Sequence, residues 1–87
     1  YTGDLDWIRF IAGWSGSTDV ELTWTGSSSD YDLYILDSTY TTLDDSITDA
    51  TSPALESVSS SLTIASTYYL VVAGWSGDAV DYELTIE

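Results

Sequence analysis

Apolar and polar residues alternate along most of this chain, in short stretches separated by turn residues. The clearest stretch is 18–25, where Val20, Leu22 and Trp24 occupy one face and acidic or hydroxyl side chains occupy the other. Successive side chains of a β-strand point to opposite faces of the sheet, so this pattern predicts a half-buried strand. Similar patterns predict strands over residues 4–12, 18–25, 30–37, 40–43, 56–65, 67–73 and 80–87.

Two of these segments carry most of the predicted core. Segment 67–73 is rich in Tyr, Leu and Val throughout, which is typical of a central strand buried on both faces. In segment 30–37, Tyr31, Leu33 and Ile35 share one face. No helical periodicity persists anywhere, so the chain predicts one all-β domain, 1–87, an antiparallel β-sandwich of about seven to eight short strands.

The sequence Ala-Gly-Trp-Ser-Gly occurs twice, at 12–16 and at 73–77, and an acidic strand follows each copy. Two hairpins with similar turn chemistry are the favoured interpretation. The alternative is a duplicated edge feature that displays Trp14 and Trp75 as contact residues.

Charge restricts the functions open to this protein. Its 87 residues include 15 acids and one base, Arg9, for a formal net charge of −14. Such a surface excludes nucleic acid, because nucleic-acid binding requires basic groups that displace counterions. A high-salt habitat, binding of divalent cations, and selection for solubility all remain open.

Missing residue types add to this picture. The chain has no Lys, His, Cys, Met, Asn or Gln, and loss of the labile side chains is a trend in proteins from hot environments. Without His or Cys the usual nucleophile and base pairs of hydrolases are absent, so no enzymatic activity is expected. No apolar run approaches 18 residues, so no membrane span is predicted. A chain that begins with Tyr1 fits a cloned fragment or a secreted mature product, and we expect the latter.

The acids of segment 30–37 suggest a metal site. Asp30 and Asp32 share a face and lie roughly 7 Å apart, at ~3.3 Å per residue. Calcium prefers six to eight oxygen ligands, and the lack of nitrogen and sulfur ligands argues against zinc. The alternative is that these acids are solvated surface charge. Arg9 shares a face with Trp7 and could stack on it, although a cross-strand pair with Glu21 or Glu83 is favoured.

Large aromatic side chains exceed what a core of this size readily holds. They could cap the ends of the sandwich, or they could form a recognition or self-association surface, since Trp and Tyr dominate interface hot spots. The candidates for binding or self-association are Trp7, Trp14, Trp75, Tyr31 and Tyr40.

Five motifs in register resemble the bacterial pre-peptidase C-terminal domain, whose relatives include the collagen-binding modules of secreted collagenases. They are Asp-Leu-Asp-Trp-Ile-Arg-Phe at 4–10, Asp-Tyr-Asp-Leu-Tyr-Ile-Leu-Asp at 30–37, Glu-Ser-Val-Ser at 56–59, Thr-Tyr-Tyr-Leu-Val-Val at 67–72, and Gly-Trp-Ser-Gly with Asp-Tyr-Glu-Leu-Thr at 74–85. The match covers nearly the whole chain, but family members usually carry several Lys and Arg.

This resemblance implies a jelly-roll-like sandwich, an extracellular location, no catalytic activity and calcium near the N-terminal end. Carried over by position, the implied ligands are the acidic pair before the first strand, the acidic pair that opens the third strand, and two further acids in the loop before the last strand. They are Asp4, Asp6, Asp30, Asp32, Asp78 and Asp81.

Three functions are compatible with these observations. The favoured one is a secreted, calcium-binding structural domain that self-associates into filaments or matrix, because edge strands and aromatic turns offer contacts. The alternative is a targeting module of a secreted peptidase that binds protein fibres or polysaccharide. A folding or secretion aid removed on maturation is the third.

Overall fold

The computed structural model describes residues 5–24, 30–46, 55–76 and 82–87, and only the backbone at residues 30, 75 and 76. The described residues form seven strands: β1 (Leu5–Ile11), β2 (Gly16–Trp24), β3 (Asp30–Leu36), β4 (Thr42–Ser46), β5 (Leu55–Leu62), β6 (Thr67–Ser76) and β7 (Tyr82–Ile86). In this part of the chain no helix is long and apolar enough to cross a membrane.

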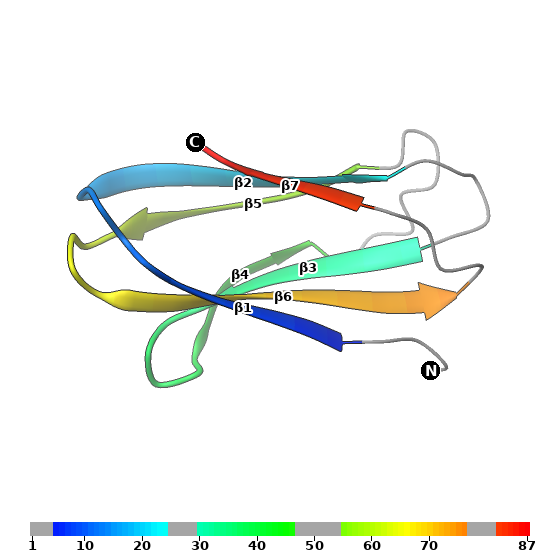
Figure 1. The fold of residues 1–87 in the computed structure, drawn as a ribbon, viewed down its shortest axis with the longest axis horizontal. Helices are drawn as coiled ribbons and strands as arrows, with labels where there is room; N and C mark the ends of the chain where they lie inside the picture. Colours follow the sequence, from blue (N-terminus) through cyan, green and yellow to red (C-terminus); the bar gives the residue numbers. More distant parts are fainter. Residues whose placement is uncertain (1–4, 25–29, 47–54, 77–81) are drawn as a thin grey trace.

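Two antiparallel sheets face one another across the core (Figure 1). The four-stranded sheet has the order β1-β6-β3-β4, and the three-stranded sheet has the order β5-β2-β7. The predicted all-β class and antiparallel sandwich are confirmed. Among the described strands, β3 and β4 follow one another in the chain and pair within one sheet. Every other connection between successive strands crosses from one sheet to the other.

Alternation along the strands builds the core, as the pattern predicts. Val20 and Leu22 of β2 are fully buried, as are Leu33 and Ile35 of β3. Val72 of β6 lies opposite Leu33 and is also buried. Because opposite residues of an antiparallel pair share a face, these side chains form one apolar layer between the sheets.

The β6 strand lies at the centre of the four-stranded sheet, between β1 and β3. Its register shifts against β3 between Asp30 and Tyr31, where Tyr31 lies opposite Gly74 and Asp30 opposite Ser76. One residue of β6 is therefore extra at this point, which is the pattern of a β-bulge. The strand continues to Ser76 of the second Ala-Gly-Trp-Ser-Gly sequence, so the turn expected there is wrong over residues 74–76, while Gly77 lies outside the described residues.

The two copies of that sequence consequently have different structures. The first connects β1 in one sheet to β2 in the other, whereas the second lies mostly inside β6. Neither forms a hairpin within one sheet, so the interpretation as two similar hairpins is also wrong.

The strand predicted around Tyr40 begins later, at Thr42, and Tyr40 itself lies in the turn before β4 with a φ of 65°. Few residues other than Gly, Asn or Asp adopt this left-handed conformation, which alternation cannot reveal.

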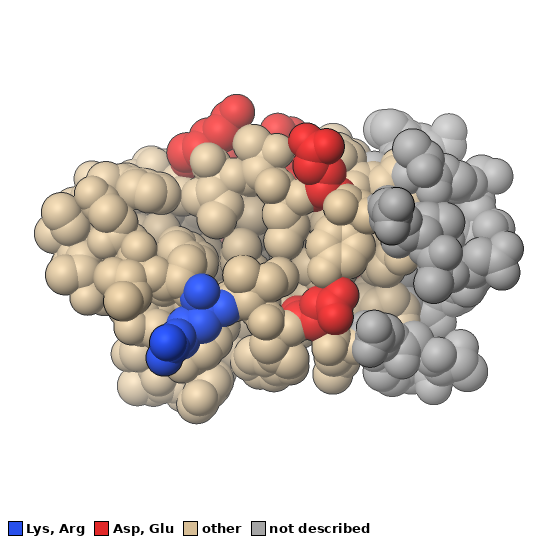
Figure 2. All heavy atoms as spheres, viewed as in Figure 1, with Lys and Arg blue, Asp and Glu red and all other residues tan. Residues whose placement is uncertain are grey.

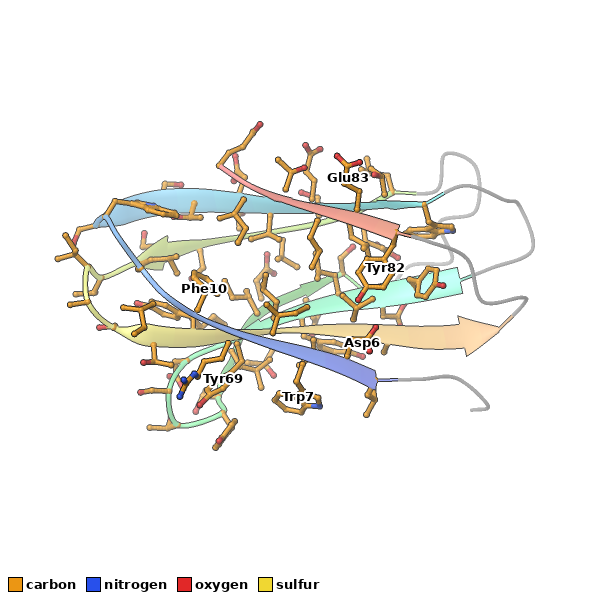
Figure 3. The ribbon with its side chains drawn as sticks, viewed as in Figure 1. Asp6, Trp7, Phe10, Tyr69, Tyr82 and Glu83 are labelled. Carbon is orange, nitrogen blue, oxygen red and sulfur yellow. The ribbon has the colours of Figure 1, made fainter. Side chains whose placement is uncertain are left out.

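Side-chain contacts join the sheets along both sides of the sandwich. On one side, the Ser59 amide of β5 donates to Asp44 Oδ2 of β4 at 2.8 Å, and Ser46 of β4 donates to the buried Glu56 of β5. On the other side, the Tyr82 hydroxyl of β7 donates to Asp6 Oδ2 of β1 at 2.7 Å. Figure 3 shows Asp6 and Tyr82 pointing toward one another between the sheets.

Candidate interaction surface

The acids predicted to bind calcium occupy different surroundings. Asp6 lies opposite Val72 and so faces the core side of the four-stranded sheet, where it is half-buried and accepts the Tyr82 hydrogen bond. Asp32 lies opposite Ala73, on the outer face of the same sheet, and is 5% exposed. These two carboxylates are on opposite sides of one sheet, so they do not jointly fit a single ion.

The other predicted ligands cannot be placed. Asp4, Asp78 and Asp81 lie outside the described residues, and of Asp30 only the backbone is described. Within the described part of the chain, no group of three or more His, Cys, Asp or Glu could hold a metal ion. Calcium therefore stays a prediction of the sequence.

Exposed apolar side chains gather on the outer face of the four-stranded sheet, over β1. Trp7 is 53% exposed, Leu5 49% and Ile11 64%, because the outward residues of this edge strand have no second layer above them. Tyr69 of β6 lies opposite Arg9 on the same face. We call this surface the aromatic face, made of Leu5, Trp7, Arg9, Ile11, Tyr40 and Tyr69.

Three rings of the aromatic face contact one another. Tyr40 stacks on Tyr69, with ring centroids 4.9 Å apart and planes at 27°. Trp7 meets both rings edge-on, at 6.2 Å from each. Such contacts contribute about 0.5–1.5 kcal/mol per pair beyond the area they bury. Trp7 lies opposite Val71 of β6, which is buried, yet Trp7 and Tyr40 themselves remain more than half exposed.

The turn between β3 and β4 places Tyr40 in this cluster. Asp37 Oδ1 accepts hydrogen bonds from the Thr39 amide at 2.9 Å, the Thr39 hydroxyl at 2.7 Å and the Thr41 amide at 3.0 Å. The Tyr40 amide donates to the Asp37 carbonyl at 3.0 Å. Hydrogen bonds from the Thr39 side chain, then from the Thr41 backbone, lower the pKa of Asp37.

Electrostatic surroundings differ between the two halves of this outer face. Over β1 and β6, the hydrogen bond with Tyr40 raises the pKa of Tyr69, while the nearby charge of Arg9 opposes that rise. Over β3 and β4, burial raises the pKa of Tyr34, and the charges of Asp32 and Asp45 raise it further. The half that carries the aromatic face is thus the half that carries the protein's one base.

Arg9 does not pair with Glu21 or Glu83, contrary to the favoured prediction. Those acids lie opposite Thr85 and Thr23 in the three-stranded sheet, whereas Arg9 belongs to the outer face of the other sheet. Alternation showed the correct face of each strand but not which strands share a sheet.

The three-stranded sheet has a contrasting outer face. This face carries four carboxylates, interspersed with Ser and Thr. They are Asp19 and Glu21 on β2, Glu83 on β7, and Glu87 just after β7. Figure 2 shows most of its acidic side chains along the upper side of the molecule. The basic side chain lies on the lower part, where one further acidic side chain lies to its right. Trp7 and Tyr69 lie below that sheet in Figure 3, on the side away from the core.

The other aromatic residues predicted to form contacts differ in position and exposure. Tyr31 is 9% exposed and packs against Trp24 at 5.1 Å and Tyr82 at 5.7 Å, so its predicted role at a surface is wrong. Trp14 is 40% exposed at the β1–β2 connection, where its indole donates to Thr18 Oγ1 at 2.7 Å. The side chain of Trp75 lies outside the described residues.

Leu5, Ile11 and Tyr69 belong to the aromatic face but were not among the predicted contact residues. Leu5, Trp7 and Ile11 occupy alternate positions of β1 and so point to the same face, which the alternation of the sequence could have shown. Tyr69 sits in a segment that is apolar on both faces, where the sequence carries no signal for the outward side.

Compared with models of known protein families and with curated proteins, the chain matches none.

Proposed function

We propose that this protein is a non-catalytic structural domain that self-associates through the aromatic face. The observation that carries the proposal is the exposure of Leu5, Trp7, Ile11 and Tyr40 on one face of an otherwise highly acidic chain. Contiguous exposed apolar surface of this kind marks interaction sites in soluble proteins.

Charge favours a second copy as the occupant. Copies with a formal charge of −14 repel one another, so contact is least costly where the surface carries no acid. The aromatic face meets that condition and also holds Arg9. The absence of His and Cys from the sequence supports a role other than catalysis.

Salt provides the first test. Raising ionic strength from about 0.01 M to about 1 M shortens the Debye length from about 30 Å to about 3 Å, which screens the repulsion between copies and leaves apolar contact intact. Light scattering and negative-stain imaging should therefore show larger assemblies at high salt. Monomers at every salt and protein concentration would remove the proposal.

A second candidate is a module that binds polysaccharide, because exposed Trp7 and Tyr40 rings also suit stacking on sugars. Tryptophan fluorescence titrated with soluble oligosaccharides distinguishes the two, since self-association needs no added ligand. Membership of the pre-peptidase C-terminal family, an extracellular location and calcium binding belong to the same proposal. Calcium binding is tested by melting curves with calcium and with EGTA.

A further inference from the structure

The outer edge of β1 is available for pairing. Among the described strands, β1 pairs with β6 alone, so the backbone groups along its other edge face away from the sheet over Leu5–Ile11. An edge of this kind is a template for another strand unless charge, a bulge or a covering segment blocks it.

The other three edges are less suited to a second copy. Asp44 and Asp45 lie on β4, and Asp44 also covers the β5 edge by accepting the Ser59 amide. Glu83 lies on β7, and Glu87 follows its end. Pairing β4 with its own copy brings carboxylates together, which destabilises a sheet. A second copy at the β5 edge approaches Asp44, and one at the β7 edge approaches Glu83 and Glu87. By contrast, the outward residues of β1 include no acid.

The sequence of β1 complements itself when reversed about Ile8. In an antiparallel pair centred there, Leu5 of one copy lies opposite Ile11 of the other, and Trp7 lies opposite Arg9. Apolar side chains thus meet apolar side chains, and each cation meets an indole. Two-fold symmetry supplies each of these pairs twice.

From this complementarity we infer that β1 pairs antiparallel with β1 of a second copy, centred at Ile8, and joins two four-stranded sheets into one. The inference rests on the proposed self-association and names its interface. Contacts between Trp7, Tyr40 and Tyr69 hold the indole in place before pairing, which lowers the cost of ordering it. Arg9 of the second copy then meets the indole in a cation–π contact.

The core-side residues of β1 are compatible with this register. Asp6 comes opposite Phe10 of the second copy, and the Asp6 carboxylate accepts the Tyr82 hydroxyl within its own copy. The pair therefore brings no two carboxylates into direct opposition along β1.

Disulfide trapping tests the register, because the chain contains no cysteine. Leu5→Cys and Ile11→Cys are prepared separately and mixed under mild oxidation. Opposite residues have Cα atoms about 4.5–5.5 Å apart, within the range of about 4.4–6.8 Å for a disulfide. Identical residues are offset by six positions, or about 20 Å. The mixture should give cross-linked dimers of one variant with the other, and each variant alone should give few.

Sedimentation of the wild type separates the possible failures. If it stays monomeric at all concentrations and salts, the proposed function and this inference fail together. If it associates but mixed disulfides do not predominate over those formed by either variant alone, the β1 pairing alone is overturned.

Two variants of equal net charge test the Trp7–Arg9 pairs. Arg9→Ala removes both pairs from the dimer, and Thr42→Glu adds one acid on β4, so each makes the protein more negative by one unit. We expect Arg9→Ala to weaken the dimer about tenfold, or about 1.4 kcal/mol. We expect Thr42→Glu to change its Kd by about twofold at most. Equal weakening by both would contradict the specific pairing and indicate a general charge effect.

Discussion

Removing the Tyr82 hydroxyl tests how the β1 side of the sandwich is held. In Tyr82→Phe the ring that packs against Tyr31 stays, and the 2.7 Å hydrogen bond to the half-buried Asp6 carboxylate is lost. Hydrogen bonds to charged groups contribute about 1.5–3 kcal/mol. Because water can reach Asp6 in the variant, the low end of that range, about 1.5 kcal/mol, is expected.

Thermal unfolding followed by circular dichroism measures this effect. For a domain of this size, about 1 kcal/mol corresponds to about 4–8 °C in Tm, so Tyr82→Phe should melt about 6–12 °C below the wild type. Urea titration should show a lower midpoint with an unchanged slope. Measurements at low protein concentration keep association from adding to the apparent stability.

A matched control and a double-mutant cycle make the reasoning refutable. Tyr34→Phe removes a hydroxyl on the outer face of β3 and should change the free energy of unfolding by less than about 0.5 kcal/mol. Combining Tyr82→Phe with Asp6→Ala should cost about 1–2 kcal/mol less than the sum of the single variants, because both remove the same bond. Equal changes in the free energy of unfolding for Tyr82→Phe and Tyr34→Phe, or strictly additive changes in the double-mutant cycle, would refute a stabilising Tyr82–Asp6 hydrogen bond.

Three further predictions concern the core, the turn and calcium. Leu33→Ala, at a fully buried site, should cost about 2–5 kcal/mol in urea unfolding, and a smaller loss than Tyr82→Phe would contradict the packed core. Asp37→Ala should lower Tm at neutral pH. The pKa of Asp37 in the folded state is lowered from 3.8, so its contribution to folding stability is present above pH 3.8 and is lost as the pH falls through the folded-state pKa. The Tm values of wild type and variant should therefore converge in acid. A Tm difference that stays constant with pH would contradict this prediction. Calcium at about 100 times its Kd should stabilise the fold by about 2.7 kcal/mol relative to EGTA, and identical melting curves would remove the calcium prediction.

The sequence predicted the core more reliably than the surface. Alternation placed Val20, Leu22, Leu33 and Ile35 correctly, because burial of one face repeats every second residue. The same alternation carries no information about strand partners, which explains why Arg9 was predicted to pair with acids of the other sheet.

The candidate interaction surface was predictable only in part. Trp7 and Tyr40 were expected at a surface and lie there, whereas Tyr31 was expected there and is buried. Tyr40 reaches Tyr69 through a turn that depends on left-handed backbone at Tyr40 and on three hydrogen bonds to Asp37. These hydrogen bonds are local, but the alternation of apolar and polar residues does not reveal them.

Association through the aromatic face is tested most directly by sedimentation velocity on the wild type and two matched variants over a range of concentrations at high salt. Leu5→Ser removes an exposed apolar side chain from the aromatic face, and Leu55→Ser makes the same change at an exposed position of β5 in the other sheet. We predict that the wild type and Leu55→Ser associate as concentration rises, while Leu5→Ser shifts toward monomer. A monomeric wild type, or equal association of all three proteins, would contradict the account.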